Sequence, residues 1–128
     1  MSTSLSFEAV RPNLVMSSGY QAAWEKLFRY FDVEPKLAKP NLVKDKMAIN
    51  PKDLIEMCDE KTIGIVGILG NHYNGIYDPV WDIDPLVSQL NADKGWQIGI
   101  HVDAASGGFI APFQEEMADK VSKPCSCV

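Results

Sequence analysis

Short apolar runs alternate with amphipathic stretches along the chain. Apolar runs bounded by turn-forming residues predict buried strands at 13–17, 63–69 and 98–103. The run at 63–69 is apolar at odd and even positions alike, so helices are expected to cover both faces of that strand, as in a parallel sheet. A shorter strand is expected at 33–37, and Pro35 confines it to a sheet edge or a strand end.

Helices are predicted between these strands. Over 20–31, apolar side chains recur on one helical face, made of Ala23, Trp24, Leu27, Phe28 and Phe31. Asn50 can cap a second helix over 51–59, which begins with a proline. A third helix is predicted over 82–93 and stops near Gly95. Its apolar stripe consists of Ile83, Leu86, Val87 and Leu90.

The remaining long segments carry neither pattern. The lysine-rich segment 38–47 is interpreted as a surface connection, and 114–128 is polar without a clear periodicity. Strand and helix therefore alternate along most of the chain. This order predicts an α/β fold with a mainly parallel sheet and flanking helices.

Composition and charge narrow the functional classes. Hydrophobic residues make up 46% and charged residues 23%, which is typical of a folded domain. The 12 Lys and Arg against 17 Asp and Glu give a net charge of −5, which argues against nucleic-acid binding because phosphates require a basic face. No signal peptide, polybasic stretch or membrane-length apolar run is present, so no membrane partner is expected. Cys58, Cys125 and Cys127 form no disulfide framework, and reduced thiols in a cytoplasmic protein are expected.

Polar, glycine-containing segments follow three of the predicted strands, at 17–21, 70–75 and 103–108. Ligands of open α/β sheets bind beyond the carboxyl ends of the strands. We therefore expect these segments to meet at one candidate site. The alternative is that each glycine or serine only makes a turn.

Asp103 is the most informative residue of these segments. It ends an apolar strand and precedes small side chains, so its carboxylate needs a cationic partner or several hydrogen-bond donors. It is either a cap on the following turn or a carboxylate directed at a bound cation, with Ala105 leaving room for a flat ring. No dinucleotide or phosphate-loop motif is present. His72 and His101 are too isolated to bind a metal, and His101, on the strand face of Asp103, is interpreted as a core residue.

The segment around Asp103 resembles a known enzyme family. Residues 101–113 (HVDAASGGFIAPF) are similar to the aspartate segment of pyridoxal-phosphate-dependent glutamate decarboxylase, a group II decarboxylase. Further similar segments follow in the same order: 11–15 (RPNLV), 24–26 (WEK), 29–34 (RYFDVE), 58–64 (CDEKTIG) and 68–70 (ILG). Generic pyridoxal enzymes share only the Asp-x-Ala core, so the longer run favours the glutamate enzymes.

This resemblance implies part of the large domain of the aspartate-aminotransferase-like (fold type I) enzymes. It implies pyridoxal 5′-phosphate as cofactor and conversion of L-glutamate to 4-aminobutanoate and carbon dioxide. By position, Asp103 would pair with the pyridinium nitrogen, which keeps the ring protonated and electron-withdrawing. Ala105 and Gln21 would pack on opposite faces of the ring. His72 would reach its polar edge, at a position where bacterial members carry threonine.

The resemblance also predicts what this chain does not do alone. The family's Schiff-base lysine lies in a Ser-x-x-His-Lys segment downstream of Phe113, and neither Lys120 nor Lys123 follows a histidine. We therefore expect no catalytic residue and no activity from this chain alone. Residues 1–10 are expected to be an N-terminal extension, 11–113 a partial large domain and 114–128 a divergent tail.

The family's active site forms at a dimer interface, which makes a full-length subunit a candidate partner. Three alternatives remain open. The chain is a non-catalytic product that pairs with such a subunit, a piece of another pyridoxal-dependent decarboxylase or lyase, or an unrelated α/β ligand-binding domain.

Overall fold

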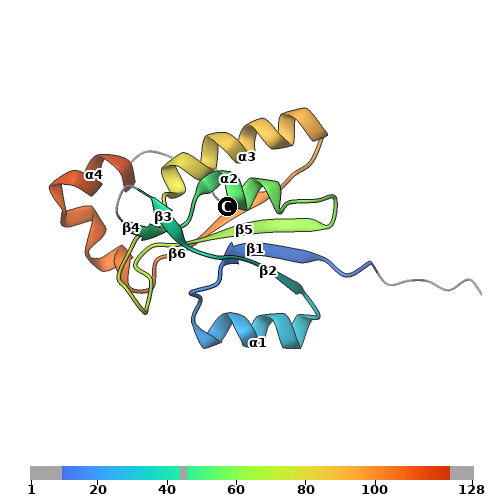
Figure 1. The fold of residues 1–128 in the computed structure, drawn as a ribbon, viewed down its shortest axis with the longest axis horizontal. Helices are drawn as coiled ribbons and strands as arrows, with labels where there is room; N and C mark the ends of the chain where they lie inside the picture. The colour runs from blue at the N-terminus through green and yellow to red at the C-terminus, as the bar shows by residue number, and fades with distance from the viewer. Residues whose placement is uncertain (1–9, 44–45, 122–128) are drawn as a thin grey trace, which may run out of the picture.

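The computed structural model describes residues 10–43 and 46–121, and its centre is a parallel sheet (Figure 1). The spatial order of the four strands is β2 (Glu34–Ala38), β1 (Asn13–Ser17), β5 (Thr62–Ile68) and β6 (Gly99–Asp103). The α-helices are α1 (Ala22–Phe31), α2 (Pro51–Glu56), α3 (Val80–Lys94) and α4 (Glu115–Val121). The short 3₁₀ helices η1 (Gly107–Phe109) and η2 (Ala111–Phe113) lie between β6 and α4. The predicted α/β architecture is confirmed.

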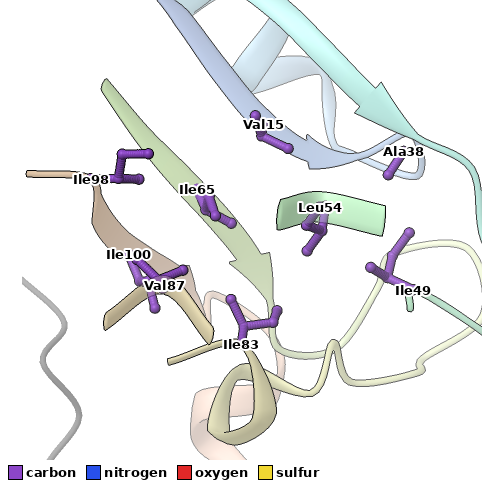
Figure 2. Close-up of a cluster of buried hydrophobic side chains, with 9 residues drawn as sticks. All are labelled: Val15, Ala38, Ile49, Leu54, Ile65, Ile83, Val87, Ile98 and Ile100. Atoms are coloured by element: carbon purple, nitrogen blue, oxygen red, sulfur yellow. The ribbon is translucent and has the colours of Figure 1, made fainter. Parts of the chain in front are cut away.

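One face of the sheet packs against α2 and α3, which lie above the sheet in Figure 1. Figure 2 shows the buried side chains of this layer: Val15, Ala38, Ile49, Leu54, Ile65, Ile83, Val87, Ile98 and Ile100. Strand residues contribute at alternate positions because successive side chains point to opposite faces of a sheet. Ile83 and Val87 are buried and Leu86 and Leu90 half-buried, so the predicted stripe of α3 is confirmed.

The opposite face packs against α1, which lies below the sheet in Figure 1. Its buried cluster consists of Met16, Phe28, Val33, Val66 and Ile68. The predicted apolar face of α1 is only partly right: Trp24 and Leu27 are half-buried against this cluster, whereas Ala23 is exposed and Phe31 is 73% exposed. Helical periodicity identified the face but not how far the sheet extends beneath it.

Coverage of β5 is also incomplete. Ile63 is 54% exposed, so the expectation that both faces of this strand are covered is wrong near its amino end. An open groove lies beside it, lined by Leu14, Ile63, Gly64, Ile65, Gly99, Ile100 and His101. The helix α1 therefore shields the carboxyl half of the strand better than its amino half.

Two other expectations need correction. The segment 38–47, interpreted as a surface connection, contains β3 (Asn41–Val43), which pairs antiparallel with β4 (Lys46–Ala48). The polar segment after Phe113 forms α4 over its described part, and Lys120 on this helix lies 5.0 Å from the ring centroid of Trp81 on α3. Cys125, Cys127 and Lys123 lie outside the described residues, as do positions 1–9 of the expected extension.

Local signals at element ends were reliable. The Asn50 side chain accepts a hydrogen bond from the Lys52 backbone N–H at 3.1 Å, which confirms the cap of α2. Gly95 has φ +68° and ends α3, as predicted. β2, which contains Pro35, is the edge strand that the proline required. No α-helix within 10–43 or 46–121 has the length and apolarity to cross a membrane.

A polar cluster joins three strands at their amino ends. The Asp59 carboxylate accepts hydrogen bonds from Lys36 Nζ on β2, from Asn13 Nδ2 on β1 at 2.9 Å, and from the Lys61 backbone N–H at 2.8 Å. Thr62 Oγ1 donates to Asn13 Oδ1 at 2.7 Å. The hydrogen bonds from Lys36 and Asn13 hold the pKa of Asp59 well below its usual range. This Asp59 cluster holds β1, β2 and β5 together at the end of the sheet opposite to their carboxyl ends.

Candidate functional site

The segments that follow β1, β5 and β6 meet in an open pocket at the carboxyl end of the sheet. The pocket is a shallow, open hollow, with about 350 Å³ of space that includes adjoining solvent. Its lining residues are Gly19, Gln21, Ile68, Gly70, His72, Asp103, Ala105 and Ser106. The expected convergence of the segments 17–21, 70–75 and 103–108 is confirmed. The structure thus brings together all four residues to which the resemblance assigned a cofactor contact.

The carboxylate of Asp103 is held by donors on both of its oxygens. Oδ2 accepts a hydrogen bond from the indole Nε1–H of Trp24 at 2.7 Å, and Oδ1 accepts one from the Ala105 backbone N–H at 3.3 Å. The second bond is the turn cap considered from the sequence, so capping and a half-buried, pocket-facing position occur together. The backbone of Asp103 also accepts from the Leu69 N–H at 2.8 Å, which fixes β6 to the end of β5.

Trp24 is the functional neighbour that sequence reasoning missed. It was placed in the apolar face of α1 as a core residue, yet its indole N–H bridges from α1 to the end of β6. A signal was available, because a partly buried indole N–H needs an acceptor and the first turn of α1 follows the carboxyl end of β1. His101 completes the contact from the other side: its ring centroid lies 5.5 Å from that of Trp24, edge to face. His101 is exposed, so its interpretation as a core histidine is wrong, whereas its placement on the face of Asp103 is confirmed.

Glycines allow the loops around the pocket to approach one another. Gly107 donates its N–H to Leu69 O at 2.9 Å, and a Cβ added to Gly107 would lie 2.2 Å from that oxygen. Gly70 has φ +93°, and its Cβ would lie 2.8 Å from Gly107 N. Any larger side chain at either position would force the loops after β5 and β6 apart. The small residues of 103–108 therefore serve packing between loops as well as the pocket.

Asn71 fastens the loop after β1 to the loop after β5. Its side chain is buried and donates from Nδ2 to Gly19 O at 3.0 Å, while its Oδ1 accepts from the Tyr73 N–H at 2.9 Å. No sequence pattern singles out this asparagine, because its partner on Gly19 is a backbone oxygen 52 positions away. Its amide sets the separation between the segments that carry Gln21 and His72.

Gln21 and His72 are exposed residues of the pocket lining. Gln21 is the N-cap residue of α1, but its side chain makes no capping hydrogen bond and is therefore available to the pocket. The His72 ring packs edge to face against Tyr73, with 5.5 Å between ring centroids. Both side chains lie on segments that the Asn71 hydrogen bonds join, and both are exposed to solvent.

Asp78 supports the pocket from behind. It is 4% exposed, and its Oδ2 accepts the Ile68 backbone N–H at 2.8 Å, while its own N–H donates to Ile68 O at 2.9 Å. Burial raises the pKa of this carboxyl to about 6, against the opposing effect of the Ile68 hydrogen bond. This pair ties the end of β5 to the start of α3. It does not line the pocket that contains Asp103.

Residues 5–126 match the model of the pyridoxal-dependent decarboxylase conserved domain. The chain belongs to this family. It is 43% identical over 111 residues to glutamate decarboxylase beta of Listeria innocua, covering 87% of this chain and 24% of the relative. It matches the glutamate decarboxylase structure from Lactobacillus brevis with a TM-score of 0.76 and 41% identity, covering 88% of this chain and 25% of the other.

The fold agrees with a more distant relative. The aspartate aminotransferase from Rhizobium meliloti matches with a TM-score of 0.59 at 13% identity, over 73% of this chain and 23% of that one. This likeness shows the fold of the aminotransferase-like pyridoxal enzymes. The chain spans about a quarter of the length of the glutamate decarboxylases that it matches.

Membership of this decarboxylase family implies pyridoxal 5′-phosphate, and the donor set of the pocket suits its ring. A pyridinium N–H requires an acceptor, and each oxygen of the Asp103 carboxylate accepts one hydrogen bond from the protein and has a further lone pair. The flat faces of a ring require small or planar neighbours, which Ala105 and Gln21 provide at the pocket lining. His72 adds a polar group to the same lining. The residues present therefore fit the aromatic part of the cofactor.

Proposed function

We propose that this chain carries the ring-binding side of a pyridoxal-phosphate-dependent glutamate decarboxylase site. Asp103 is proposed to accept a hydrogen bond from the protonated pyridine nitrogen, with Ala105 and Gln21 against the two ring faces and His72 at the polar edge. The observation that carries this proposal is the single pocket lined by all four residues, with the Asp103 carboxylate held from both sides.

The chemistry follows from where the negative charge lies. When bound, the cofactor supplies a ring that accepts the electron pair left by departing carbon dioxide. Asp103 keeps a proton on the ring nitrogen, because an anion within hydrogen-bond distance favours the protonated base. Ala105 excludes water from one ring face without adding a polar group. L-glutamate is the proposed substrate because the relatives that match at 41–43% identity bear the name glutamate decarboxylase.

This chain alone is proposed not to decarboxylate. The sequence contains no Ser-x-x-His-Lys segment, and Lys120 follows Asp119 on α4, where it packs over Trp81. The purified chain mixed with pyridoxal 5′-phosphate should show no visible Schiff-base absorbance and should release no carbon dioxide from L-glutamate. A borohydride-reducible adduct at one specific lysine would contradict this part of the proposal.

The ring contact itself can be tested without covalent chemistry. The probe is 4′-deoxypyridoxine 5′-phosphate, which lacks the aldehyde, titrated into ¹⁵N-labelled chain. We expect backbone signals of Gln21, His72 and Ala105 to move, and Asp103→Asn to raise the Kd roughly tenfold or more, as for loss of a hydrogen bond to a charged group. Asp93→Asn, on the exposed end of α3, is the matched control. Equal weakening by both variants, or signal changes elsewhere only, would refute the assignment.

A second candidate function is association with a full-length subunit without catalysis. The observation that favours it is the exposed apolar surface after β6, where Phe109 is 80%, Ile110 55% and Phe113 86% exposed. Co-expression with a full-length glutamate decarboxylase, followed by affinity capture and light scattering, tests it. Capture should be reduced by Phe113→Ser and not by Tyr30→Ser, which changes another exposed aromatic residue, on α1. Equal capture of both variants would exclude this surface.

A further inference from the structure

Trp24 and Asp103 form a contact that links two elements distant in sequence. The indole Nε1–H of Trp24, in the first turn of α1, donates to Asp103 Oδ2 at 2.7 Å across a separation of 79 positions. The bond is at the short end of the range for N–H···O contacts, as expected for a donor to a carboxylate. Both residues are only partly accessible to solvent, so water competes weakly for this bond.

The indole ring is itself held in place. His101 packs edge to face on it at 5.5 Å between centroids, and the side chain contributes to the cluster around Phe28 beneath α1. Its donor atom therefore has little freedom to move away from Oδ2. The Ala105 N–H at 3.3 Å from Oδ1 is the weaker of the two contacts, which makes Trp24 the main restraint on the carboxylate plane.

We propose that Trp24 is a positioning residue that orients the Asp103 carboxylate toward the pyridine nitrogen of a bound B6 ring. This inference rests on the proposed function. A carboxylate can rotate about its Cβ–Cγ bond, and only some orientations present a lone pair to the pocket. The indole N–H on Oδ2 and the weaker Ala105 N–H on Oδ1 select the orientation and leave the second lone pair of each oxygen for the ligand. Trp24 itself does not line the pocket.

The contact can be tested first on the chain without ligand. In ¹⁵N-labelled chain, the indole N–H of Trp24 should exchange with solvent at least about tenfold more slowly than in the Asp103→Ala variant, which has no side-chain acceptor at this position. The indole of Trp96, which packs with the cluster on the other face of the sheet, should exchange equally in both proteins. An unchanged exchange rate of the Trp24 indole N–H in Asp103→Ala would overturn the proposal, and this measurement does not require substitution of Trp24 itself.

The positioning role is tested with two ligands that differ at one ring atom. One is 4′-deoxypyridoxine 5′-phosphate, and the other is its 1-deaza analogue, which has C–H in place of the ring nitrogen. The wild-type chain should prefer the pyridine ligand, and Trp24→Phe should reduce that preference about fivefold or more while leaving the Kd of the deaza analogue unchanged. Trp96→Phe is the matched control and should retain the wild-type preference.

The outcomes separate the two proposals. If the wild-type chain shows no preference for the pyridine ligand, the ring contact of Asp103 fails and the Trp24 proposal falls with it. If the wild type has the preference and Trp24→Phe keeps it in full, the ring contact stands and only the positioning role is overturned. If Trp24→Phe weakens both ligands equally, Trp24 is structural and the proposal is likewise overturned.

Discussion

Neutralising Asp59 should destabilise the fold far more than neutralising an exposed carboxylate. The Asp59 side chain is 35% exposed and that of Lys36 25%, so their ion pair is neither fully solvated nor dry. Asp59→Asn removes the charge that accepts hydrogen bonds from Lys36, Asn13 and the Lys61 N–H. Exposed ion pairs contribute about 0.2–1 kcal/mol and hydrogen bonds to charged groups about 1.5–3. We therefore expect Asp59→Asn to cost about 2 kcal/mol at pH 7.

The assay is urea unfolding followed by far-ultraviolet circular dichroism, with Glu25→Gln as the matched control. Glu25 pairs with Arg29 at 3.9 Å on the outer surface of α1, where the side chains are 61% and 74% exposed. This control should cost less than about 0.5 kcal/mol. If Asp59→Asn loses no more stability than Glu25→Gln, the Asp59 cluster does not secure the strands and the reasoning fails.

The pH dependence of the same variant gives a second check. The pKa of Asp59 is lower in the folded chain than in the unfolded chain, so its stabilisation is present above the unfolded value, about 4, and is lost as the pH falls below it. The difference in stability between wild type and Asp59→Asn should therefore shrink steadily between about pH 5 and pH 3. A constant difference across that window would contradict the assigned role of the charge.

Three further predictions follow from single residues. Gly70→Ala should cost more stability than Gly75→Ala: both glycines have positive φ, but only a Cβ at Gly70 meets another atom within 4 Å. Backbone strain of roughly 1–2 kcal/mol is common to both variants, so the difference between their urea unfolding free energies measures the clash. The pKa of Asp78 is raised to about 6, so the wild type should lose stability as the pH rises from about 4 through 6. Asp78→Asn should remove up to about 3 kcal/mol of that pH-dependent loss, and an unchanged slope in urea titrations would count against burial of the charge. Burial raises the pKa of Cys58 to about 11, so little reactive thiolate is present at pH 8. Iodoacetamide should therefore alkylate Cys58 far more slowly in the native chain than in the urea-denatured chain, as measured by mass spectrometry of the Cys58 peptide.

The sheet could be predicted because its strands are unambiguous in sequence. The run around Ile65 is apolar on both faces, and the stripe containing Ile83 and Val87 has helical spacing, so local pattern and burial agree. β3 and β4 could not be predicted in the same way. Each has three residues, and they pair only with each other within the described residues, so the strands are too short for an alternation to develop. Exposure of Phe31 and Ile63 depends on where neighbouring elements end, which periodicity does not encode.

The candidate site was predictable in its location and less so in its supports. The rule that ligands bind at the carboxyl ends of parallel strands was enough to bring Asp103, His72 and Gln21 to one pocket. The supporting contacts depend on three-dimensional proximity between distant segments. Trp24 reaches Asp103 and Asn71 reaches Gly19 through hydrogen bonds that no spacing rule identifies.

In the described part of the chain β6 is the outermost strand of the sheet, and Asp103 is its last residue. Its outer row of backbone N–H and C=O groups is free to template a neighbour, which would run about 5 Å away. A strand that pairs there, from the same polypeptide or another, would place one of its ends beside Asp103. Extension of the sheet and enlargement of the pocket wall would then be one event, which would be measurable as a gain in rigidity along β6.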